Sequence, residues 1–596
     1  MLRPAILLAT VSLLCVHCLG QQDANQPLAQ SPAAASSNST PSNSAATNSV
    51  SHAAQPQELP KIQTRADLVL VPVVVTRSGK HVGGLQKDTF RVEENGKERS
   101  VSIFEEVKTE KLAVSGRNER LQSYSNFALG DEQTWRLTAI VLDMINTPSM
   151  RQLEAKRQLI EFLLRSASRE EPTAVFGLNG TGLHQLHPFT TDPKVLIAGL
   201  EKLKVSLSSE EATQPPEVFT DDPAEEQDAA EEEQLLNDFM QDLSDSLAAD
   251  YQRIATRQTL VGMTQLAHAF EAVPGRKTLI WASAGFPFTI DDPQSFARQG
   301  DEMQSEYEEA WRVLNSANIA VYPVDLSAME FSTRNLPSAN SGTSSTQINN
   351  IRGTNGMKSA LRLPYDKSVQ QQLTLHAFAD ATGGRACITV EELDKCFAEA
   401  VDDSRDYYLL GYYLGSDTQP GWRKLKVKVA GDGLRLRYRS GFYIAPKLQD
   451  STALRRQQIA DALASPVDYT GLRLTARLLP PPSSGPSSPS GSQQKKTAEF
   501  MLGVMGDSLT IDRDRGNAID LEVITLAFDN NHRNVSRSGQ SIATELKPER
   551  LQRTLQAGIG IPEKVELPAG SYEVKFAVRD NLSGRLATVS VPLELK

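Results

Sequence analysis

The chain has 596 residues, room for roughly three or four domains of ordinary size. Its formal net charge is −11 and it carries no cluster of Lys and Arg, which argues against nucleic acid or an anionic membrane surface as the main partner.

The first 20 residues predict a secretory signal peptide. One early Arg precedes an apolar run from Ala5 to Cys15 that is too short to span a membrane, and Gln21 and Gln22 follow it. We therefore expect export to the periplasm, the cell surface or the extracellular space, with cleavage after Gly20. A Cys at this edge makes lipidation the alternative, although the residues before Cys15 and Cys18 fit a lipoprotein signal poorly. No other apolar run is long enough for a transmembrane helix.

Two short regions precede the largest predicted domain. Residues 21–59 are Ser, Ala, Asn, Gln, Thr and Pro with almost no large apolar residue, which predicts a disordered spacer. Residues 60–107 predict a small β unit, because Leu68 to Val75 has the composition of a strand and the pair Asn95-Gly96 is typical of a hairpin turn. A polar connection follows.

Residues 134–405 predict an α/β domain. The apolar run from Leu137 to Leu142 indicates a buried strand, and an amphipathic helix is expected from about Ser149 to Ser166. Between them lie a carboxylate, an amide and a hydroxyl. In an open α/β sheet, ligands bind outside the carboxyl ends of the strands, so this loop is the candidate functional edge.

This strand and its loop resemble a von Willebrand factor A domain, most closely the VWFA-related acidobacterial variant, whose first strand ends in Asp-x-x-Asn-Thr-Pro, as in Asp143 to Pro148. The resemblance covers about Ala66 to Pro446. It implies a doubly wound, Rossmann-like domain flanked by β-rich units. It also implies a metal-ion-dependent adhesion site, in which Mg²⁺ or another divalent cation would bind to Asp143, Asn146, Thr147 and Thr191.

The chain departs from the metal site of the wider family at two other positions. Ile145 replaces the middle Ser of the first loop, and Ala284 stands where the family places an Asp after another strand. A cation such as Mg²⁺ needs several oxygen ligands, so we expect a degenerate site at most. Thr191, with Thr190 as the neighbouring candidate, has a second interpretation, since Thr-Thr-Asp before a helix is also a plain N-cap, and the cap is favoured.

Two irregular segments interrupt the α/β domain. Residues 208–247 form an acidic insertion, which predicts a solvated excursion with one helix, about Glu232 to Ala248, more than a Ca²⁺ or basic-partner patch. Residues 335–362 predict a flexible loop. Beyond them, Gly383-Gly384 is expected to end a helix.

The mature chain would retain two cysteines, Cys387 and Cys396. Export permits a disulfide, and the short separation favours a local bridge slightly over two buried thiols.

The C-terminal part is predicted to be rich in strands. Residues 406–446 indicate a β-rich extension, and a helix is expected from Ala453 to Ala464. Residues 466–596 contain at least five further strands with turn signals between them, which suggests an immunoglobulin-like β-sandwich with a Pro/Ser/Gly-rich loop at 480–496.

The sequence contains no familiar catalytic set. His184 and His187 would point to opposite faces of a strand, and Ser283 lacks the Gly-x-Ser-x-Gly elbow of a hydrolase. We therefore expect a non-enzymatic binding or adhesion-type protein with a protein or surface partner. A metal-free scaffold in a cell-envelope assembly is the alternative, and a hydrolase with an unrecognised site is the weakest hypothesis.

Overall fold

The computed structural model describes residues 68–108, 123–126, 137–165, 172–206, 208, 230–286, 304–326, 372–388, 393–415, 419–444, 452–480 and 495–595. The predicted signal peptide, the spacer and the loop at 335–362 lie outside these residues. So do most of the loop at 480–496 and the first half of the acidic insertion.

The centre of the α/β domain is a five-stranded sheet in the order β11-β10-β7-β8-β9. Four strands are parallel, and β9 runs antiparallel to β8 at one edge. Every residue of β7 is buried, as its apolar run predicts. The strands are β7 (Thr138–Asp143), β8 (Thr173–Asn179), β9 (Gly182–Thr190), β10 (Lys277–Ser283) and β11 (Ile319–Asp325).

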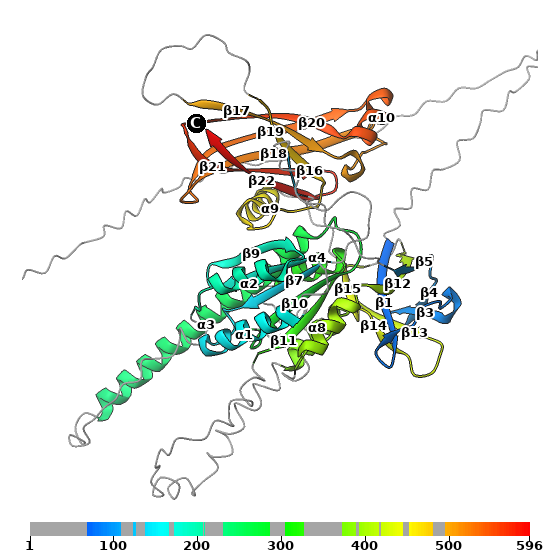
Figure 1. Cartoon of the computed structure of the whole chain (residues 1–596), viewed down its shortest axis with the longest axis vertical. Coiled ribbons are helices and arrows are strands. Elements are labelled where there is room, and N and C mark those ends of the chain that lie inside the picture. Colours follow the sequence, from blue (N-terminus) through cyan, green and yellow to red (C-terminus); the bar gives the residue numbers. More distant parts are fainter. Residues whose placement is uncertain are drawn as a thin grey trace, which may run out of the picture. The chain divides into compact units, whose positions relative to one another are not determined.

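Helices cover both faces of this sheet (Figure 1). Side chains alternate along β7, so that Ala139 and Val141 face one layer of helices while Ile140 and Leu142 face the other. The α/β class predicted from the sequence is therefore confirmed. The first layer contains α3 (Ala230–Ala269), α4 (Gln304–Ser316) and a helix over 372–382, and the second contains α1 (Ser149–Arg165), α2 (Pro193–Lys202) and α8 (Leu393–Asp402).

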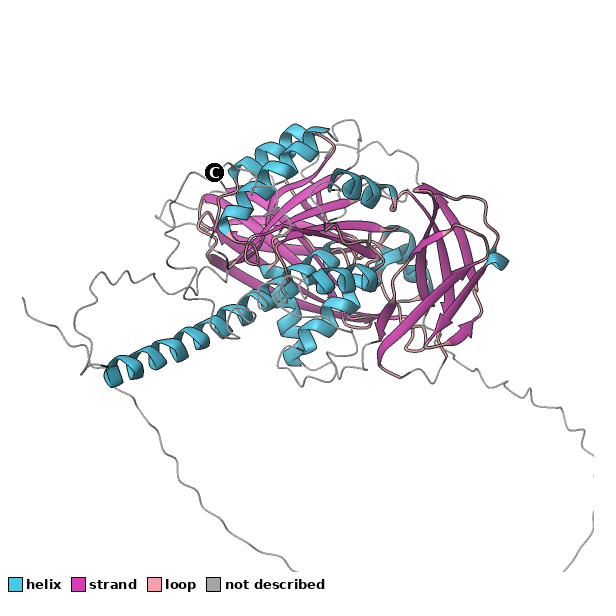
Figure 2. Ribbon diagram, turned by 90° about the horizontal axis from the view of Figure 1, so that it is seen from below, coloured by secondary structure: helices cyan, strands magenta, loops and turns pink. Residues whose placement is uncertain are grey.

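The predicted helix of the acidic insertion is not a separate element. It is the first part of α3, a continuous helix of 40 residues that extends beyond the sheet (Figure 2). The second part packs on the sheet through Leu260, Met263 and Leu266, at the three-residue spacing of one helix face. The acidic segment therefore continues directly into the domain core.

The two short β-rich regions, expected as separate units, form one interleaved β-sandwich. β1 pairs with β12 and β14, and β3 pairs with β13, so strands more than 300 residues apart lie side by side (Figure 1). The α/β domain is thus inserted between two halves of one fold. Its strands are β1 (Leu68–Arg77), β2 (Lys80–His81), β3 (Phe90–Glu94), β4 (Lys97–Arg99), β5 (Ile103–Lys108), β12 (Asp406–Tyr413), β13 (Gly421–Val429), β14 (Arg435–Arg437) and β15 (Gly441–Ile444).

The core of this sandwich explains the strand pattern of the sequence. Val69, Val71, Val73 and Val75 alternate along β1 and pack against the second sheet. Tyr408 from β12 lies in the same core, where its ring is 5.0 Å from that of Phe90. The residues of both chain segments are therefore needed to bury one apolar interior.

The C-terminal domain is a second antiparallel sandwich, with sheets β20-β17-β16-β6 and β19-β18-β21-β22 around one core. Its edge strand β6 comes from the predicted polar connection near residue 124, and the sequence analysis missed β19 and α10. The elements are β6 (Ser123–Ser125), α9 (Thr452–Ala464), β16 (Leu474–Leu478), β17 (Lys496–Val504), β18 (Ala518–Asp529), β19 (Asn534–Glu545), α10 (Pro548–Ala557), β20 (Ile559–Leu567), β21 (Gly570–Asp580) and β22 (Leu586–Leu595).

Cys387 and Cys396 form a disulfide, with their Cα atoms 6.0 Å apart. Both side chains are buried among the helices of the second layer, and Cys387 also forms a parallel bridge with Val324 beside β11. The disulfide therefore joins the segment beside β11, at the outer edge of the sheet, to α8. In the described part of the chain, no helix combines the length and apolar character needed to cross a membrane.

Candidate functional site

Asp143 is the last residue of β7, the central strand of the sheet. It is in register with Leu178 of β8, at the carboxyl edge of the parallel strands. Its side chain is completely buried, with 0 % of its surface exposed. The candidate anchor residue therefore lies at the expected edge but below the surface.

The Asp143 carboxylate is surrounded by nitrogen donors from its own domain. Oδ1 accepts a hydrogen bond from the backbone N–H of Asn146 at 3.2 Å. Oδ2 accepts from Asn146 Nδ2 at 2.8 Å and from Trp281 Nε1 at 3.0 Å. Protein groups thus hold both carboxylate oxygens.

Burial makes the Asp143 carboxyl a weaker acid than an exposed aspartic acid. Burial raises the pKa of the Asp143 carboxyl to about 6, and hydrogen bonds from Asn146 and Trp281 limit the rise. These donors stabilise the charged form of the carboxyl, whereas its burial destabilises that form.

Two further hydrogen bonds connect this loop to neighbouring elements. Asn146 Nδ2 also donates to Thr259 Oγ1 of α3 at 2.9 Å. Thr147 is fully buried, and its Oγ1 accepts from the backbone N–H of Ala284 at 3.1 Å, just beyond β10. The Thr147 hydroxyl therefore joins the loop after β7 to the turn after β10.

Gln152 of α1 holds the backbone of the loop that follows β7. Its buried amide donates to the carbonyl oxygens of Met144 and Thr147, at 3.0 and 2.7 Å. The same side chain exchanges two hydrogen bonds with the backbone of Ser206, beyond α2. One glutamine therefore fixes two loops at the carboxyl edge, a role that the sequence analysis did not assign.

Thr191 does not join the other predicted residues. Its neighbour Thr190 pairs with Thr173 at the start of β8, whereas Asp143 pairs with Leu178 at the end of β8. Five residues of strand correspond to roughly 17 Å, so Thr191 lies near the opposite edge of the sheet. The N-cap interpretation is confirmed there, because Asp192 accepts a hydrogen bond from the backbone of Lys194 at the start of α2.

The residues at Asp143 do not fit an octahedral Mg²⁺ site. Such a cation needs several oxygen ligands with lone pairs directed at one point. The carboxylate already accepts N–H donors, and Ile145 and Ala284 contribute apolar side chains that are themselves buried. Across the described ranges, no group of three His, Cys, Asp or Glu side chains is arranged to hold a metal ion.

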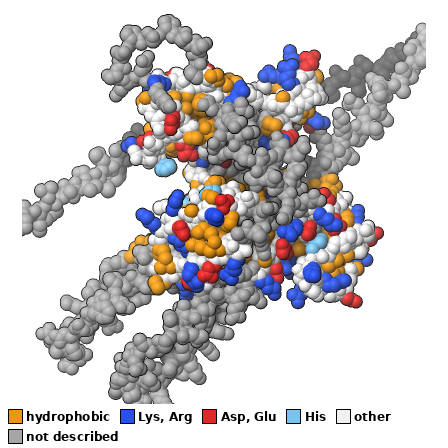
Figure 3. Space-filling model, in the orientation of Figure 1, with side chains coloured by type: hydrophobic (Ala, Val, Ile, Leu, Met, Phe, Trp, Pro, Cys, Tyr) orange, Lys and Arg blue, Asp and Glu red, His pale blue; other side chains and the backbone are white. Residues whose placement is uncertain are grey.

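Three apolar side chains near this edge are exposed. Met150 and Leu153, at the start of α1, are 78 % and 52 % exposed, and Val205 is 40 % exposed. The bonds between Gln152 and Ser206 hold the two segments that carry these side chains together. Figure 3 shows hydrophobic side chains among charged ones on the face of the domain that carries α1 and α2.

The residues considered for catalysis make local contacts. Ser283 is buried, and its hydroxyl donates to the carbonyl oxygen of Gly285 at 2.6 Å in the turn after β10. His184 Nε2 lies 2.7 Å from Thr181 Oγ1 in the β8–β9 hairpin. His187 Nδ1 contacts the carbonyl oxygen of Pro188.

Trp281 is the partner of Asp143 that the sequence analysis missed. It is in register with Val141, two residues before Asp143 on the same face of the sheet. The pairing of β7 with β10 was needed to find it, since the two residues are 138 positions apart. Alternation along both strands then predicts that they share a face.

No protein-family model matches the chain, and none of the curated proteins with which it was compared is significantly similar.

Proposed function

We propose that the protein is an exported, non-enzymatic binding protein whose α/β domain binds a protein partner through its loop edge, without a metal ion. The observation that carries the proposal is the combination of a buried, fully hydrogen-bonded Asp143 with exposed Met150 and Leu153 beside it. In this proposal Asp143 fixes the conformation of the loop edge, and the exposed apolar side chains contact the partner.

The topology supports assigning the domain to the von Willebrand factor A type. Four parallel strands with one antiparallel edge strand, covered by helices on both faces, agree with the doubly wound fold that the loop motif implies. The position of Asp143 at the end of the central strand agrees with the same assignment. Fold alone does not define function, so the proposal depends on the chemistry of the edge.

A protein partner fits this edge better than a small molecule. Exposed apolar side chains that lie together on a surface are typical of contact sites for other proteins. Met150 offers an unbranched side chain that can adapt to a partner. Export, which rests on the N-terminal sequence, would place this surface outside the cytoplasm; sequencing the N-terminus of the mature protein tests that part.

The metal question is tested by calorimetric titration of Mg²⁺, Mn²⁺ and Ca²⁺ into the mature protein. We expect no binding heat and no change in the melting temperature with millimolar ion. The matched variant is Asp143→Ala. Heat that is present in the wild type and absent in the variant would establish an adhesion-type metal site and overturn the metal-free proposal.

The partner surface is tested by placing a photoreactive amino acid at Met150 in the cells that produce the protein. The control is the same substitution at Leu555 of α10, which is 40 % exposed in another domain. A discrete cross-linked species with Met150, competed by purified wild-type protein and absent with Leu555, supports the proposal. Identical patterns at both positions would contradict it.

A metal-free scaffold in a cell-envelope assembly is the second candidate. The interleaved β-sandwich favours it, because a domain inserted between paired strands is held at both ends. A scaffold should remain in a stable multiprotein complex after Met150→Asp and Leu153→Asp, whereas a binding edge should lose its partner. Detectable hydrolysis in a broad panel of ester and peptide substrates would instead support the hydrolase hypothesis.

A further inference from the structure

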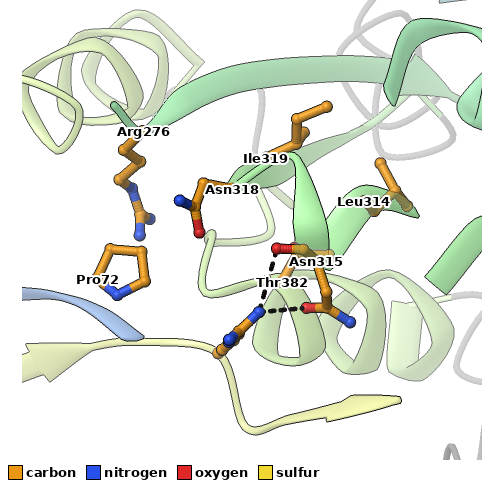
Figure 4. A pocket seen from close by; sticks show the side chains of 8 residues that line it. Pro72, Arg276, Leu314, Asn315, Asn318, Ile319 and Thr382 are labelled. Atoms are coloured by element: carbon orange, nitrogen blue, oxygen red, sulfur yellow. Dashed lines mark hydrogen bonds between the residues drawn. The ribbon is translucent and has the colours of Figure 1, made fainter. Parts of the chain in front are cut away.

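A small, partly open cavity lies at the amino end of the parallel strands, the edge opposite Asp143. Its volume is about 10 Å³. Figure 4 shows Arg276 and Asn318 extending toward this space from the α/β domain, with Pro72 of β1 beside them, while the amide oxygen of Asn315 faces the guanidinium that donates to it. Thr382 and Arg439 complete its polar lining.

Three buried N–H donors around this cavity have no acceptor within the described chain. They are Nε of Arg276, Nε of Arg439 and Nδ2 of Asn315. The three residues are only 2 %, 7 % and 8 % exposed, respectively. Buried donors are almost always paired, so a group of three without an acceptor indicates a missing binding partner.

The orientation of Asn315 follows from its other contacts. Arg439 Nη1 donates to the backbone oxygen of Asn315 at 3.2 Å and to its Oδ1 at 3.4 Å, the two bonds drawn in Figure 4. The amide oxygen must therefore face the guanidinium. The amide nitrogen is left as a donor without an acceptor.

The local charge is positive. Arg439 donates to the carbonyl oxygen of Leu70 and lies over the ring of Phe442, but no described carboxylate pairs with it. Arg276 reaches the carboxylate of Asp403 only through the hydroxyl of Tyr322. Asp403 in turn also binds Arg437 directly, so its charge is shared.

The pKa of Arg439 agrees with an uncompensated buried cation. Burial lowers it to about 10, and the electrostatic interaction with Tyr412 opposes this effect. The guanidinium still carries its charge at neutral pH. Two guanidinium groups therefore line the cavity, and none of the described residues that line it is acidic.

We propose that this cavity binds one monoatomic anion, of which chloride is the common physiological example. The volume accommodates one occupant of about the size of a water molecule, which excludes phosphate, sulfate and carboxylates. A water molecule would bring two hydrogens that need acceptors. The two buried guanidinium groups, by contrast, are positively charged, which favours an anion over a neutral water molecule.

The anion would join two domains. Pro72 and Arg439 belong to the interleaved sandwich, whereas Arg276 and Asn315 belong to the α/β domain. An anion held by donors from both sides stabilises their contact by binding the folded state alone. This inference is independent of the proposed binding function, since it concerns the other edge of the sheet.

The direct test is crystallography of the mature protein in sodium bromide, with diffraction data collected at the bromine absorption edge. We expect an anomalous peak in the cavity, beside Nε of Arg276 and Nε of Arg439. Density without anomalous signal would mean an ordered water molecule. Bromide only at the surface would mean an adventitious ion, and either result overturns the inference.

A solution test uses melting temperatures in sodium chloride and in sodium gluconate at equal ionic strength. The wild type should melt at least about 3 °C higher in chloride. Asn315→Asp supplies an internal carboxylate and should lose most of this difference. The charge-matched control, Asn534→Asp on the exposed strand β19, should keep it.

Equal chloride effects in the wild type and in Asn315→Asp would overturn the inference. If Asn315→Asp does not fold, the anomalous diffraction of the wild type still decides the question.

Discussion

Trp281 Nε1 donates a hydrogen bond to Asp143 Oδ2 at 3.0 Å, from one central strand of the α/β sheet to the end of its neighbour. This bond places an indole at the side of a carboxylate that the loop motif would assign to a metal ion. Because both residues are fully buried, the bond also limits the cost of burying a charge.

Trp281→Phe should therefore destabilise the domain beyond the loss of packing. Removing the indole N–H leaves a buried carboxylate with one donor fewer, which costs about 1–3 kcal/mol of unfolding free energy. Urea unfolding measures this loss. The control is Trp311→Phe, which removes a similar volume from the same core at a site that contacts the rings of Phe378 and Trp422. Equal losses in the two variants would show that the Asp143 bond contributes nothing.

The raised pKa of Asp143 predicts a pH dependence of stability. The carboxyl titrates at about 6 in the folded state and at 3.8 when exposed, so its contribution is fully present below pH 3.8 and is lost as the pH rises through 6. The loss corresponds to about 3 kcal/mol. Asp143→Asn cannot titrate and should lack this slope.

The measurement is the unfolding free energy of both proteins across this pH range. All other titrating groups are common to both, so the difference between the two curves isolates Asp143. Parallel curves would mean that the Asp143 carboxyl titrates at its ordinary pKa in the folded protein.

The local features of this fold could be predicted from the sequence, because each depends on nearby residues. The buried run ending at Asp143, the helix at Thr452–Ala464 and the Cys387–Cys396 disulfide are all of this kind. The pairing of the strands could not be predicted in the same way. The register of β1 with β12 joins residues more than 300 positions apart, and no short-range pattern specifies it.

In the candidate site, too, the local features could be predicted and the long-range contacts could not. The loop from Asp143 to Thr147 was predicted as the functional edge, but its partners Trp281, Thr259 and Gln152 depend on how strands and helices pack. Thr191 was placed with the wrong edge, because the sequence does not show that β9 runs antiparallel.

Gly384 shows a second limit of sequence reasoning. It was predicted only as part of a helix stop, and the backbone N–H groups of Gly383 and Gly384 do end the helix by bonding Asp380 and Ala379. A Cβ atom at Gly384, however, would lie 1.9 Å from the backbone oxygen of Val321 in β11. The close approach of a distant strand excludes any side chain.

Gly384→Ala should accordingly cost more than about 3 kcal/mol of unfolding free energy, since the contact is with backbone that is fixed in a parallel sheet. Thermal melts and soluble yield measure the effect. Gly180→Ala is the control, because a Cβ there meets nothing within 4 Å. A Gly384→Ala protein with wild-type stability would show that β11 can move away from this turn.

The interleaved sandwich predicts opposite effects for two N-terminal deletions. Removing residues 21–59 should leave the fold unchanged, as expected for a spacer. Removing residues 21–107 deletes β1 to β5, which are the pairing partners of β12 and β13 and half of the shared core. Tyr408 and Tyr412, now buried, would become exposed, so the residues from 406 to 444 should lose their structure.

Limited proteolysis with mass spectrometry distinguishes the two deletions. The longer deletion should add cleavage sites between 406 and 444 and increase the binding of a hydrophobic dye, while the shorter deletion should match the full mature chain. The C-terminal sandwich provides an internal control, because its core at residues 472–593 contains no residue from 68–108. Protection of 406–444 after the longer deletion would mean that this segment folds without its N-terminal partner, as the sequence alone suggested.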